Sequence, residues 1–342
     1  MWKKAVAVIL AAATLFCLTA CQKKGVKTYR IGIAIYQYDD NFMTLVRKEM
    51  LAYFDSLETD TVKYKVSMVD GKNDMAEQAN QVDSFIAQGM DVIILNLILP
   101  SSADAMVKKV TDAGIPLVLI NREPLGYDEN GEKIEEGYPG ILQNENVCYV
   151  GADARQSGII QGEMVNALPD HADLNGDGKI SYLMIMGEPD HIDAQYRTEY
   201  SVSTITDAGY EVECLDAQYG NWSQATGQEI AANAIAQFGD ELELVLCNND
   251  SMALGALAAI HAAGRTVGKD VYLYGVDALE EAMACVKNGT MSGTVLNDHI
   301  GQAHTMVDVA IKMLHGEKTE NYYWVDYRKV DQSYFEGSGD EA

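Results

Sequence analysis

Two spacings of hydrophobic residues alternate along most of the chain. Short runs that are apolar throughout, or that alternate with polar residues, predict β-strands. They cover residues 29–36, 63–69, 91–96, 116–120, 148–150, 180–186, 211–215, 242–247, 271–274 and 293–296. Between them, apolar residues recur every three or four positions and predict helices at 42–57, 74–88, 102–113, 155–168, 192–207, 223–237, 251–263, 279–288 and 300–315. The stretch 322–335 is again strand-like.

Residues at the ends of these segments support the assignment of helices. Asn41 precedes the first helix and is a favourable N-cap. Gly89 and Gly114 follow the next two helices, at the position where glycine commonly ends a helix. The polar stretch 126–146 is rich in Gly, Asp, Asn and Glu and predicts a surface loop. The acidic tail 337–342 predicts disorder.

Regular alternation of strands and helices predicts parallel sheets with helices on both faces. The chain has 342 residues, of which 48% are hydrophobic, so it is long enough for two domains with substantial cores. We therefore predict an α/β fold made of two domains.

Asp or Asn side chains follow nearly every predicted strand. In open α/β sheets the carboxyl ends of the strands border the ligand crevice. Carboxylates and amides there can bind pairs of neighbouring hydroxyl groups, and a ligand that lacks one hydroxyl leaves a buried group unpaired. The same residue types also cap helices, so one position alone does not decide between the two roles. The segments concerned are 37–42, 96, 187–193, 248–250, 275–277 and 297–298.

The N-terminus has the pattern of a bacterial lipoprotein signal peptide. Lys3 and Lys4 precede an apolar run over 5–20, which is shorter than the roughly 20 residues of a membrane-spanning helix. The run ends in Leu-Thr-Ala-Cys, which resembles a lipobox with Cys21 as the lipidated residue. We predict that residues 1–20 are removed, that 21–28 form a lipidated tether, and that the protein is extracytoplasmic, bound to the cell membrane only through this anchor.

The formal net charge of −26 argues against two classes of partner, nucleic acids and anionic lipid surfaces. Nucleic-acid binding needs a basic surface that neutralises phosphates, and adsorption to anionic lipid needs the same sign. The charge suits a neutral or cationic ligand and favours solubility. Four cysteines follow the tether, namely Cys148, Cys214, Cys247 and Cys285, and none forms a CxxC motif. We expect buried free thiols, although spacing alone does not exclude a disulfide.

Five collinear segments resemble the glucose/galactose-binding members of the type I periplasmic binding protein family. They are 35–42 (IYQYDDNF), 187–193 (GEPDHID), 248–255 (NNDSMALG), 274–279 (YGVDAL) and 293–298 (GTVLND). The resemblance runs from about residue 29 to about 330. It implies two Rossmann-like lobes joined by three hinge strands that close on a sugar, with lobes formed by 29–120 plus 297–330 and by 121–296 plus 331–336.

The resemblance also implies a set of ligand-binding residues. Phe42 and Trp222 would cover the two faces of the sugar, since C–H groups give a pyranose an apolar face that an aromatic ring can contact. The groups that would bind ring hydroxyls are Tyr36, Asp40, Asn96, His191, Asp193, Arg197, Asn249, Asp277 and Asn297.

Residues 173–181 match the start of an EF-hand calcium loop, with oxygen ligands at positions 1, 3 and 5 and glycine at position 6. Position 12 is Met184 instead of Glu, which excludes a standard EF-hand. The resemblance implies that a distant glutamate, Glu243, replaces it. The implied structural Ca²⁺ site consists of Asp173, Asn175, Asp177, the Lys179 carbonyl, Ser181 and Glu243, and the short Ser181 side chain departs from the glutamine usual in the family.

The function that the resemblance implies is capture of D-glucose or D-galactose by a monomeric binding protein that delivers it to an ABC sugar permease. A role with a chemoreceptor or histidine kinase, or as a sensor for another monosaccharide, stays open. No Walker A, G-x-S-x-G, HExxH or dinucleotide motif predicts an enzyme. A repressor of the same fold would need an N-terminal DNA-binding unit and a basic surface.

Overall fold

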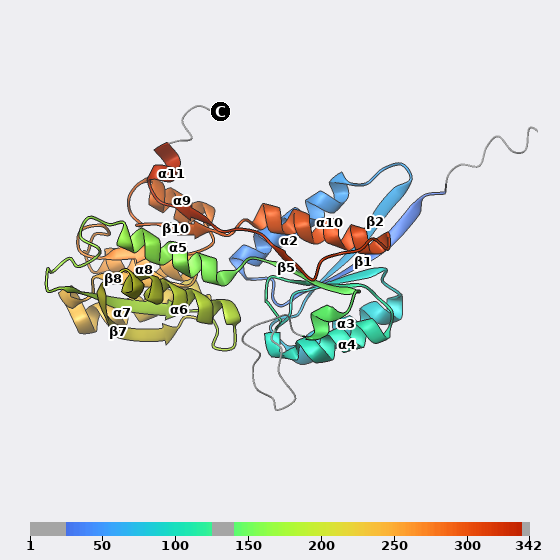
Figure 1. Cartoon of the computed structure of the whole chain (residues 1–342), viewed down its shortest axis with the longest axis horizontal. Coiled ribbons are helices and arrows are strands. Elements are labelled where there is room, and N and C mark those ends of the chain that lie inside the picture. The colour runs from blue at the N-terminus through green and yellow to red at the C-terminus, as the bar shows by residue number, and fades with distance from the viewer. Residues whose placement is uncertain (1–24, 125–139, 337–342) are drawn as a thin grey trace, which may run out of the picture.

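The computed structural model describes residues 25–124 and 140–336. The predicted signal peptide, Cys21, most of the 126–146 loop and the acidic tail lie outside these residues. Within them the chain forms two α/β lobes that stand side by side in Figure 1. None of the helices in this part of the chain combines the length and the apolar character needed to cross a bilayer.

The first lobe is built on a six-stranded parallel sheet in the order β11-β5-β4-β3-β1-β2. Its strands are β1 (Lys27–Ile35), β2 (Val62–Asp70), β3 (Val92–Leu95), β4 (Leu117–Ile120), β5 (Val147–Gly151) and β11 (Tyr322–Trp324). β3, β4 and β5 are fully buried, because helices cover both faces of the sheet.

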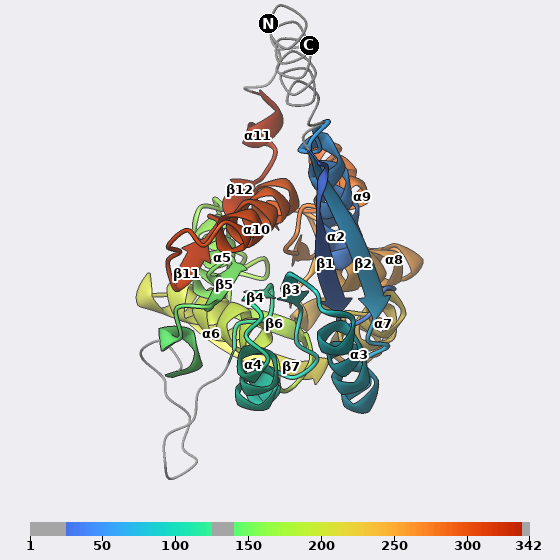
Figure 2. The ribbon, with the colours of Figure 1, turned by 90° about the vertical axis from the view of Figure 1, so that its right-hand side faces the viewer.

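Four helices cover this sheet, two on each face. α2 (Asn41–Ser56) and α10 (His299–Leu314) pack on one face against alternate residues of β1, Ile31, Ile33 and Ile35. α3 (Met75–Gln88) and α4 (Ala103–Asp112) pack on the other face against Ala34 and the alternate residues of β3. Figure 2 shows these two pairs on opposite sides of the strands.

The second lobe has a four-stranded parallel sheet in the order β7-β6-β8-β9. These strands are β6 (Lys179–Met186), β7 (Glu211–Tyr219), β8 (Leu244–Cys247) and β9 (Tyr272–Tyr274). α5 (Ala154–Asn166) and α6 (Ile192–Asp207) pack on one face, while α7 (Gln224–Phe238) and α8 (Asp250–Ala262) pack on the other. α9 (Glu280–Lys287) and α11 (Ser333–Glu336) lie beside an antiparallel pair, β10 (Thr294–Leu296) with β12 (Arg328–Val330).

The chain passes between the lobes three times: after β5, after β10 and after β11. Three connections agree with the predicted two-lobed architecture, but two of the predicted boundaries between the lobes are wrong. β5 hydrogen-bonds to β4 and β11, so residues 147–151 belong to the first lobe and not to the second. β12 pairs with β10, so residues 328–330 belong to the second lobe. Backbone pairing determines these memberships, and hydrophobic periodicity carries no information about it.

Three local predictions also change. The N-cap of α2 is Asp40, whose carboxylate accepts the backbone N–H of Met43, while Asn41 is already helical. The 3₁₀ turns are Pro100–Ser102, Gly140–Gln143 and Gly239–Glu241. The second of these places one residue of the predicted 126–146 surface loop, Leu142, in the first lobe's core, whereas residues 143–146 are exposed as expected. The segment 322–335 contains two short strands and a helical turn, where one strand-like stretch was expected.

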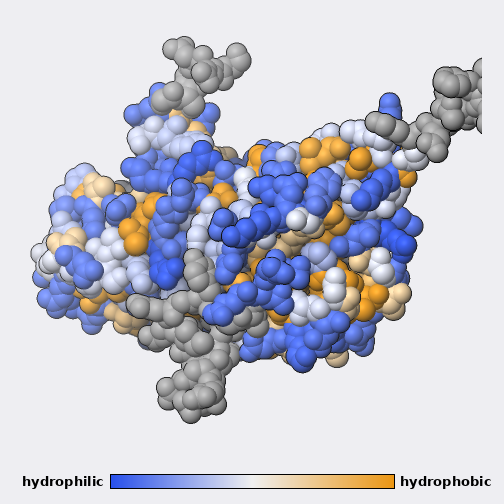
Figure 3. All heavy atoms as spheres, turned by 45° about the vertical axis from the view of Figure 1, so that its right-hand side comes forward, coloured by the Kyte–Doolittle hydropathy of each residue, from blue (hydrophilic) through white to orange (hydrophobic). Residues whose placement is uncertain are grey.

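All four cysteines in the described part of the chain are free, as the sequence predicted. Cys148 and Cys247 are buried, Cys285 is partly buried, and Cys214 is exposed. The prediction of burial is therefore wrong for Cys214. Its strand, β7, is an edge strand of the second sheet. Figure 3 shows a largely polar outer surface with small apolar patches, in keeping with the excess of acidic residues.

α7 and α8 approach each other closely at Gly255. A Cβ atom at this position would lie 2.0 Å from the backbone oxygen of Gln224, and 2.8 Å from the nitrogen of Gln228. Backbone atoms cannot move aside as a flexible side chain can. The glycine therefore sets the distance between these helices.

We expect Gly255→Ala to lower the free energy of unfolding by about 1–3 kcal/mol, because α7 and α8 must separate to admit the methyl group. Denaturant unfolding measures this change. Ala258→Ser, at an exposed position of the same helix, should stay within about 0.5 kcal/mol of the wild type. Equal stability of the two variants would contradict the close contact.

Candidate functional site

A cavity of about 360 Å³, partly open to solvent, lies between the two lobes. Loops at the carboxyl ends of strands from both sheets supply its walls. The lining residues are Tyr36, Asp40, Phe42, Met43, Asn121, Arg122, His191, Asp193, Arg197, Trp222, Asn249, Asp277 and Asn297.

Ten of the eleven residues predicted from the sequence lie in this lining. The exception is Asn96, which is fully buried beneath the cavity. Its Nδ2 donates to the backbone oxygen of Ile120 at 3.1 Å and to Oδ1 of Asn121 at 3.2 Å. Asn96 therefore supports Asn121, which lines the cavity in its place.

The first lobe contributes a carboxylate held by two hydrogen bonds. Oδ1 of Asp40 accepts the N–H of Met43 at 2.6 Å, and Oδ2 accepts the Tyr36 hydroxyl at 2.7 Å. Burial, followed by the charge of Asp40, holds the pKa of Tyr36 well above its usual value, so this hydroxyl stays a donor. Phe42 is the second residue of the helix that Asp40 caps, and it lines the cavity.

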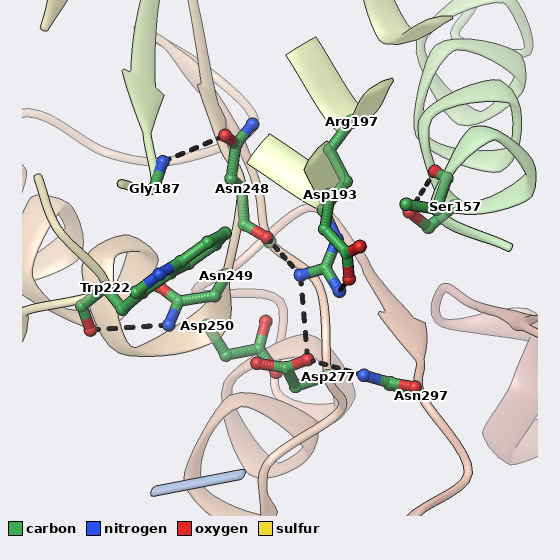
Figure 4. A network of polar contacts seen from close by, with 12 residues as sticks. Ser157, Gly187, Asp193, Arg197, Trp222, Asn248, Asn249, Asp250, Asp277 and Asn297 are labelled. Atoms are coloured by element: carbon green, nitrogen blue, oxygen red, sulfur yellow. Dashed lines mark hydrogen bonds and ion pairs between the residues drawn. The ribbon is translucent and has the colours of Figure 1, made fainter. Parts of the chain in front are cut away.

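The second lobe centres on the guanidinium of Arg197, whose side chain is 5% exposed (Figure 4). Nη1 donates to the backbone oxygen of Asn248 at 2.7 Å and lies 3.8 Å from Oδ1 of Asp277. Nη2 lies 3.4 Å from Oδ2 of Asp193 and donates to the hydroxyl of Tyr327 at 2.9 Å. One cation thus orients two carboxylates that face the cavity.

Burial changes the protonation of the groups around Arg197. It raises the pKa of Asp193 to about 6 and that of Asp277 well above its usual range, although Arg197 opposes both shifts. Burial and the nearby cations Arg122 and Arg197 hold the pKa of His191 well below its usual value. His191 is therefore neutral. Because its Nδ1 accepts the N–H of Asp193 at 3.2 Å, its Nε2 carries the proton and is a donor.

Two amides complete the polar lining. Asn297 donates from Nδ2 to Oδ1 of Asp277 at 3.2 Å and accepts from Gln302. Asn249 caps α8 by accepting the N–H of Met252 at 2.9 Å, and its Nδ2 donates to the backbone oxygen of Trp222 at 3.3 Å. Asn249 therefore caps a helix and lines the cavity at the same time.

The backbone around the cavity adopts positive φ angles at residues that rarely do so. Trp222 has φ of 62°, Asn121 has 60° and Asp277 has 119°. Such strain concentrates at binding sites. A buried carboxylate supports the backbone next to Asp277. Asp250 accepts the N–H of Leu279 at 2.8 Å and the Thr294 hydroxyl at 2.6 Å. Trp222 also lies against Gly187, where an added Cβ would come within 2.1 Å of the indole.

Sequence reasoning missed three lining residues: Met43, Asn121 and Arg122. Arg122 is almost completely buried, and its Nη2 pairs with Oε2 of Glu188 in the other lobe at 2.8 Å. A signal for the last two was available. They follow the predicted strand 116–120 directly, and the rule about strand ends applies to that strand as well.

The predicted calcium loop folds around the carboxylates expected to hold the ion. Asp173 accepts the N–H groups of Gly176, Asp177 and Gly178. Glu243, which directly precedes β8, accepts the N–H of Asn175 at 2.9 Å and that of Ser181 at 3.0 Å. Glu243 thus ties β8 to the backbone of the loop. The described residues contain no cluster of three or more His, Cys, Asp or Glu side chains that could hold a metal ion, so the calcium site stays a prediction.

The fold and the cavity define a two-lobed binding protein that encloses its ligand between α/β lobes. Residues 31–318 match the periplasmic binding protein domain, and the chain belongs to this family. Family membership makes it an extracytoplasmic binding protein and not an enzyme, in agreement with the sequence.

Several characterised proteins are similar over most of their length. The chain is 35% identical over 301 residues to the D-galactose/methyl-galactoside binding periplasmic protein of Haemophilus influenzae, covering 86% of this chain and 85% of that one. It is 29% identical over 334 residues to the ribose import binding protein of Bacillus subtilis, covering 93% and 95%. The structure resembles an ABC transporter solute binding protein of Bacillus halodurans with bound myo-inositol, with a TM-score of 0.75, 29% identity and coverage of 93% and 98%.

We expect Asp277→Ala and Trp222→Ala each to lower ligand affinity by at least about 100-fold, because each leaves buried partners unpaired or a ligand face uncovered. Calorimetric titration with the ligand measures the loss, and thermal melting shows whether each variant folds. Tyr219→Ala removes an exposed aromatic residue outside the cavity and serves as the control. Tight binding by both cavity variants would contradict the site.

Proposed function

We propose that this protein captures a free hexose, D-glucose or D-galactose, outside the cell and delivers it to an ABC sugar permease. The observation that carries the proposal is the composition of the cavity. Hydrogen-bonding groups from both lobes surround a space that Phe42 borders from the first lobe and Trp222 from the second.

The polar groups of the cavity suit a ring with several hydroxyls. Asp40, Asp193 and Asp277 are acceptors, Arg197 and His191 are donors, and the amides are both. Each hydroxyl of a sugar donates one hydrogen bond and accepts others, so it needs such a mixed set. Two aromatic residues add apolar contacts for the C–H faces of the ring.

The similar proteins support a small polyhydroxylated ring as the class of ligand. The proteins described above are named for galactose and methyl-galactoside, for ribose, or were solved with myo-inositol. All of these are small polyhydroxylated rings. The six-membered myo-inositol is therefore the second candidate, since its bound relative matches nearly the whole chain.

Capture by hinge closure follows from the three connections between the lobes. Contacts between lobes form around the cavity: Asn41 donates to the hydroxyl of Ser251 at 2.9 Å, and Arg122 pairs with Glu188. A ligand that contacts both lobes shifts the population toward the closed form by its differential affinity. The permease would recognise the closed surface. A chemoreceptor or histidine kinase would be able to read the same surface.

Two further features belong to the proposal. Lipidation at Cys21 would keep the protein at the membrane beside its permease. A Ca²⁺ ion held by Asp173, Asn175, Asp177, Lys179, Ser181 and Glu243 would supply a structural link between this loop and β8, and it would stabilise the folded state by mass action.

We expect residues 22–342 to show a rise in melting temperature with D-glucose or D-galactose. A ligand at 100 times its Kd adds about 2.7 kcal/mol to the free energy of unfolding. A panel of hexoses, pentoses and myo-inositol, tested in the presence of calcium, measures this. A rise with myo-inositol alone would replace the hexose by a cyclitol, and no rise with any of them would refute the proposal.

We expect a calcium chelator to lower the melting temperature of the wild type and to leave Glu243→Gln unaffected, because the variant lacks the carboxylate that links β8 to the loop. Glu241→Gln changes an exposed glutamate two residues away and should respond as the wild type does. If the chelator has no effect on the wild type, the calcium site is refuted.

A further inference from the structure

Two cavities meet at a single side chain. The inner cavity described above shares only Arg122 with a second, larger cavity of about 860 Å³, called the outer cavity below. The outer cavity is also partly open to solvent and is also formed by both lobes. Gln37, Asn73 and Pro100 line it from the first lobe, and Glu188, Asp190 and Asn221 line it from the second.

Consecutive residues of several loops face the two cavities. Tyr36 lines the inner cavity and Gln37 the outer one. The same holds for His191 with Asp190 and for Trp222 with Asn221. The outer cavity is therefore a direct continuation of the inner one, past the point where Arg122 stands.

Arg122 is clamped in this position by groups from both lobes. Its Cζ lies 3.7 Å from the centroid of the Tyr36 ring, Nη1 donates to the backbone oxygen of Ile98, and Nη2 pairs with Glu188 at 2.8 Å. The Arg122 side chain is 1% exposed and that of Glu188 is 18% exposed. The Nε of Arg122 has no hydrogen-bond partner among the described residues.

We propose that the Arg122–Glu188 pair is the end wall of the ligand site and limits the ligand to a single ring. This inference rests on the proposed function and adds a determinant of specificity to it. A hexose with a second ring attached would have to extend past Arg122 into the outer cavity.

Displacing the pair would carry a free-energy penalty. The guanidinium and the carboxylate form a largely buried ion pair, and separating such a pair leaves at least one charge uncompensated. A free hexose held on the inner side of Arg122 would avoid this cost, because it would leave the pair intact. The wall therefore discriminates against longer ligands by the cost of breaking the ion pair as well as by lack of space.

The outer cavity has the composition needed to accept a second ring once the wall is removed. Gln37, Asn73, Asp190 and Asn221 offer amide and carboxylate groups to hydroxyls, while Ile98 and Pro100 offer apolar surface. Removal of the wall is thus expected to create affinity for longer ligands in addition to lowering affinity for short ones.

The test compares Arg122→Ala/Glu188→Ala and Glu188→Ala with the wild type. Calorimetric titration gives the Kd of each for free glucose and galactose, for their methyl glycosides, and for disaccharides joined through O1, O4 or O6 of one hexose. The measured quantity is the ratio of the Kd for a disaccharide to the Kd for the free hexose. We expect it to fall at least about tenfold in the double variant, and less in Glu188→Ala, which keeps the buried arginine.

Arg47→Ala is the matched control. Arg47 also lies over a tyrosine ring, at 3.9 Å from the centroid of Tyr38, and donates to the backbone oxygen of Tyr38 at 2.7 Å, but it lines neither cavity. It should leave the ratio unchanged. Thermal melts of all variants verify folding.

Each other result has a definite meaning. If Glu188→Ala and the double variant weaken every ligand by the same factor, the pair only latches the lobes together and the wall is refuted. The same holds if the wild type binds a disaccharide as tightly as the free hexose. Absence of any hexose binding by the folded wild type would overturn the proposed function, and this inference with it.

Discussion

The second lobe's half of the cavity depends on one buried cation. Arg197 joins α6, the loop after β8, the loop after β9 and Tyr327 in the last connection between the lobes. Without it, the carboxylates of Asp193 and Asp277 would face each other across a desolvated space. Losing one member of such a buried pair typically costs about 3–5 kcal/mol. The arginine therefore stabilises the lobe and orients the acceptors for the ligand at once, and these two roles cannot be separated by a single substitution.

The arrangement of the polar groups explains why the site exists only between the lobes. The first lobe offers Asp40, already held by Tyr36 and by the end of α2, and the second offers the groups around Arg197. Each half is ordered before a ligand arrives, because its side chains bond to their own lobe. Preorganisation of this kind lowers the entropy lost on binding. Positive φ angles at Trp222, Asn121 and Asp277 show that the backbone is strained to present these groups.

Most of the fold and most of the cavity could be predicted from the sequence, because both depend on local patterns. Alternating strands and helices indicate parallel sheets, and the rule about strand ends locates the polar lining. The errors concern choices that depend on tertiary contacts. Asn96 and Asn121 both follow a strand, and only packing decides that Asn96 lies beneath the cavity and Asn121 within it. The rule about strand ends applies to Arg122 as well, but its burial and its pairing with Glu188 of the other lobe depend on tertiary contacts. The sequence-based prediction assigned β5 to the wrong lobe, because the pairing of β5 with β4 and β11 connects distant parts of the chain.

The close contact between Gly187 and Trp222 has an optical consequence. The sequence contains three tryptophans. Trp2 belongs to the predicted signal peptide, Trp324 is 40% exposed on the edge strand β11, and Trp222 lies in the cavity beside His191, at 5.1 Å between ring centroids. An indole fixed against a glycine has little freedom to reorient, so its emission depends mainly on what occupies the space in front of it. Without the predicted signal peptide, the chain would therefore have one tryptophan inside its cavity and a second, more exposed one as an internal reference.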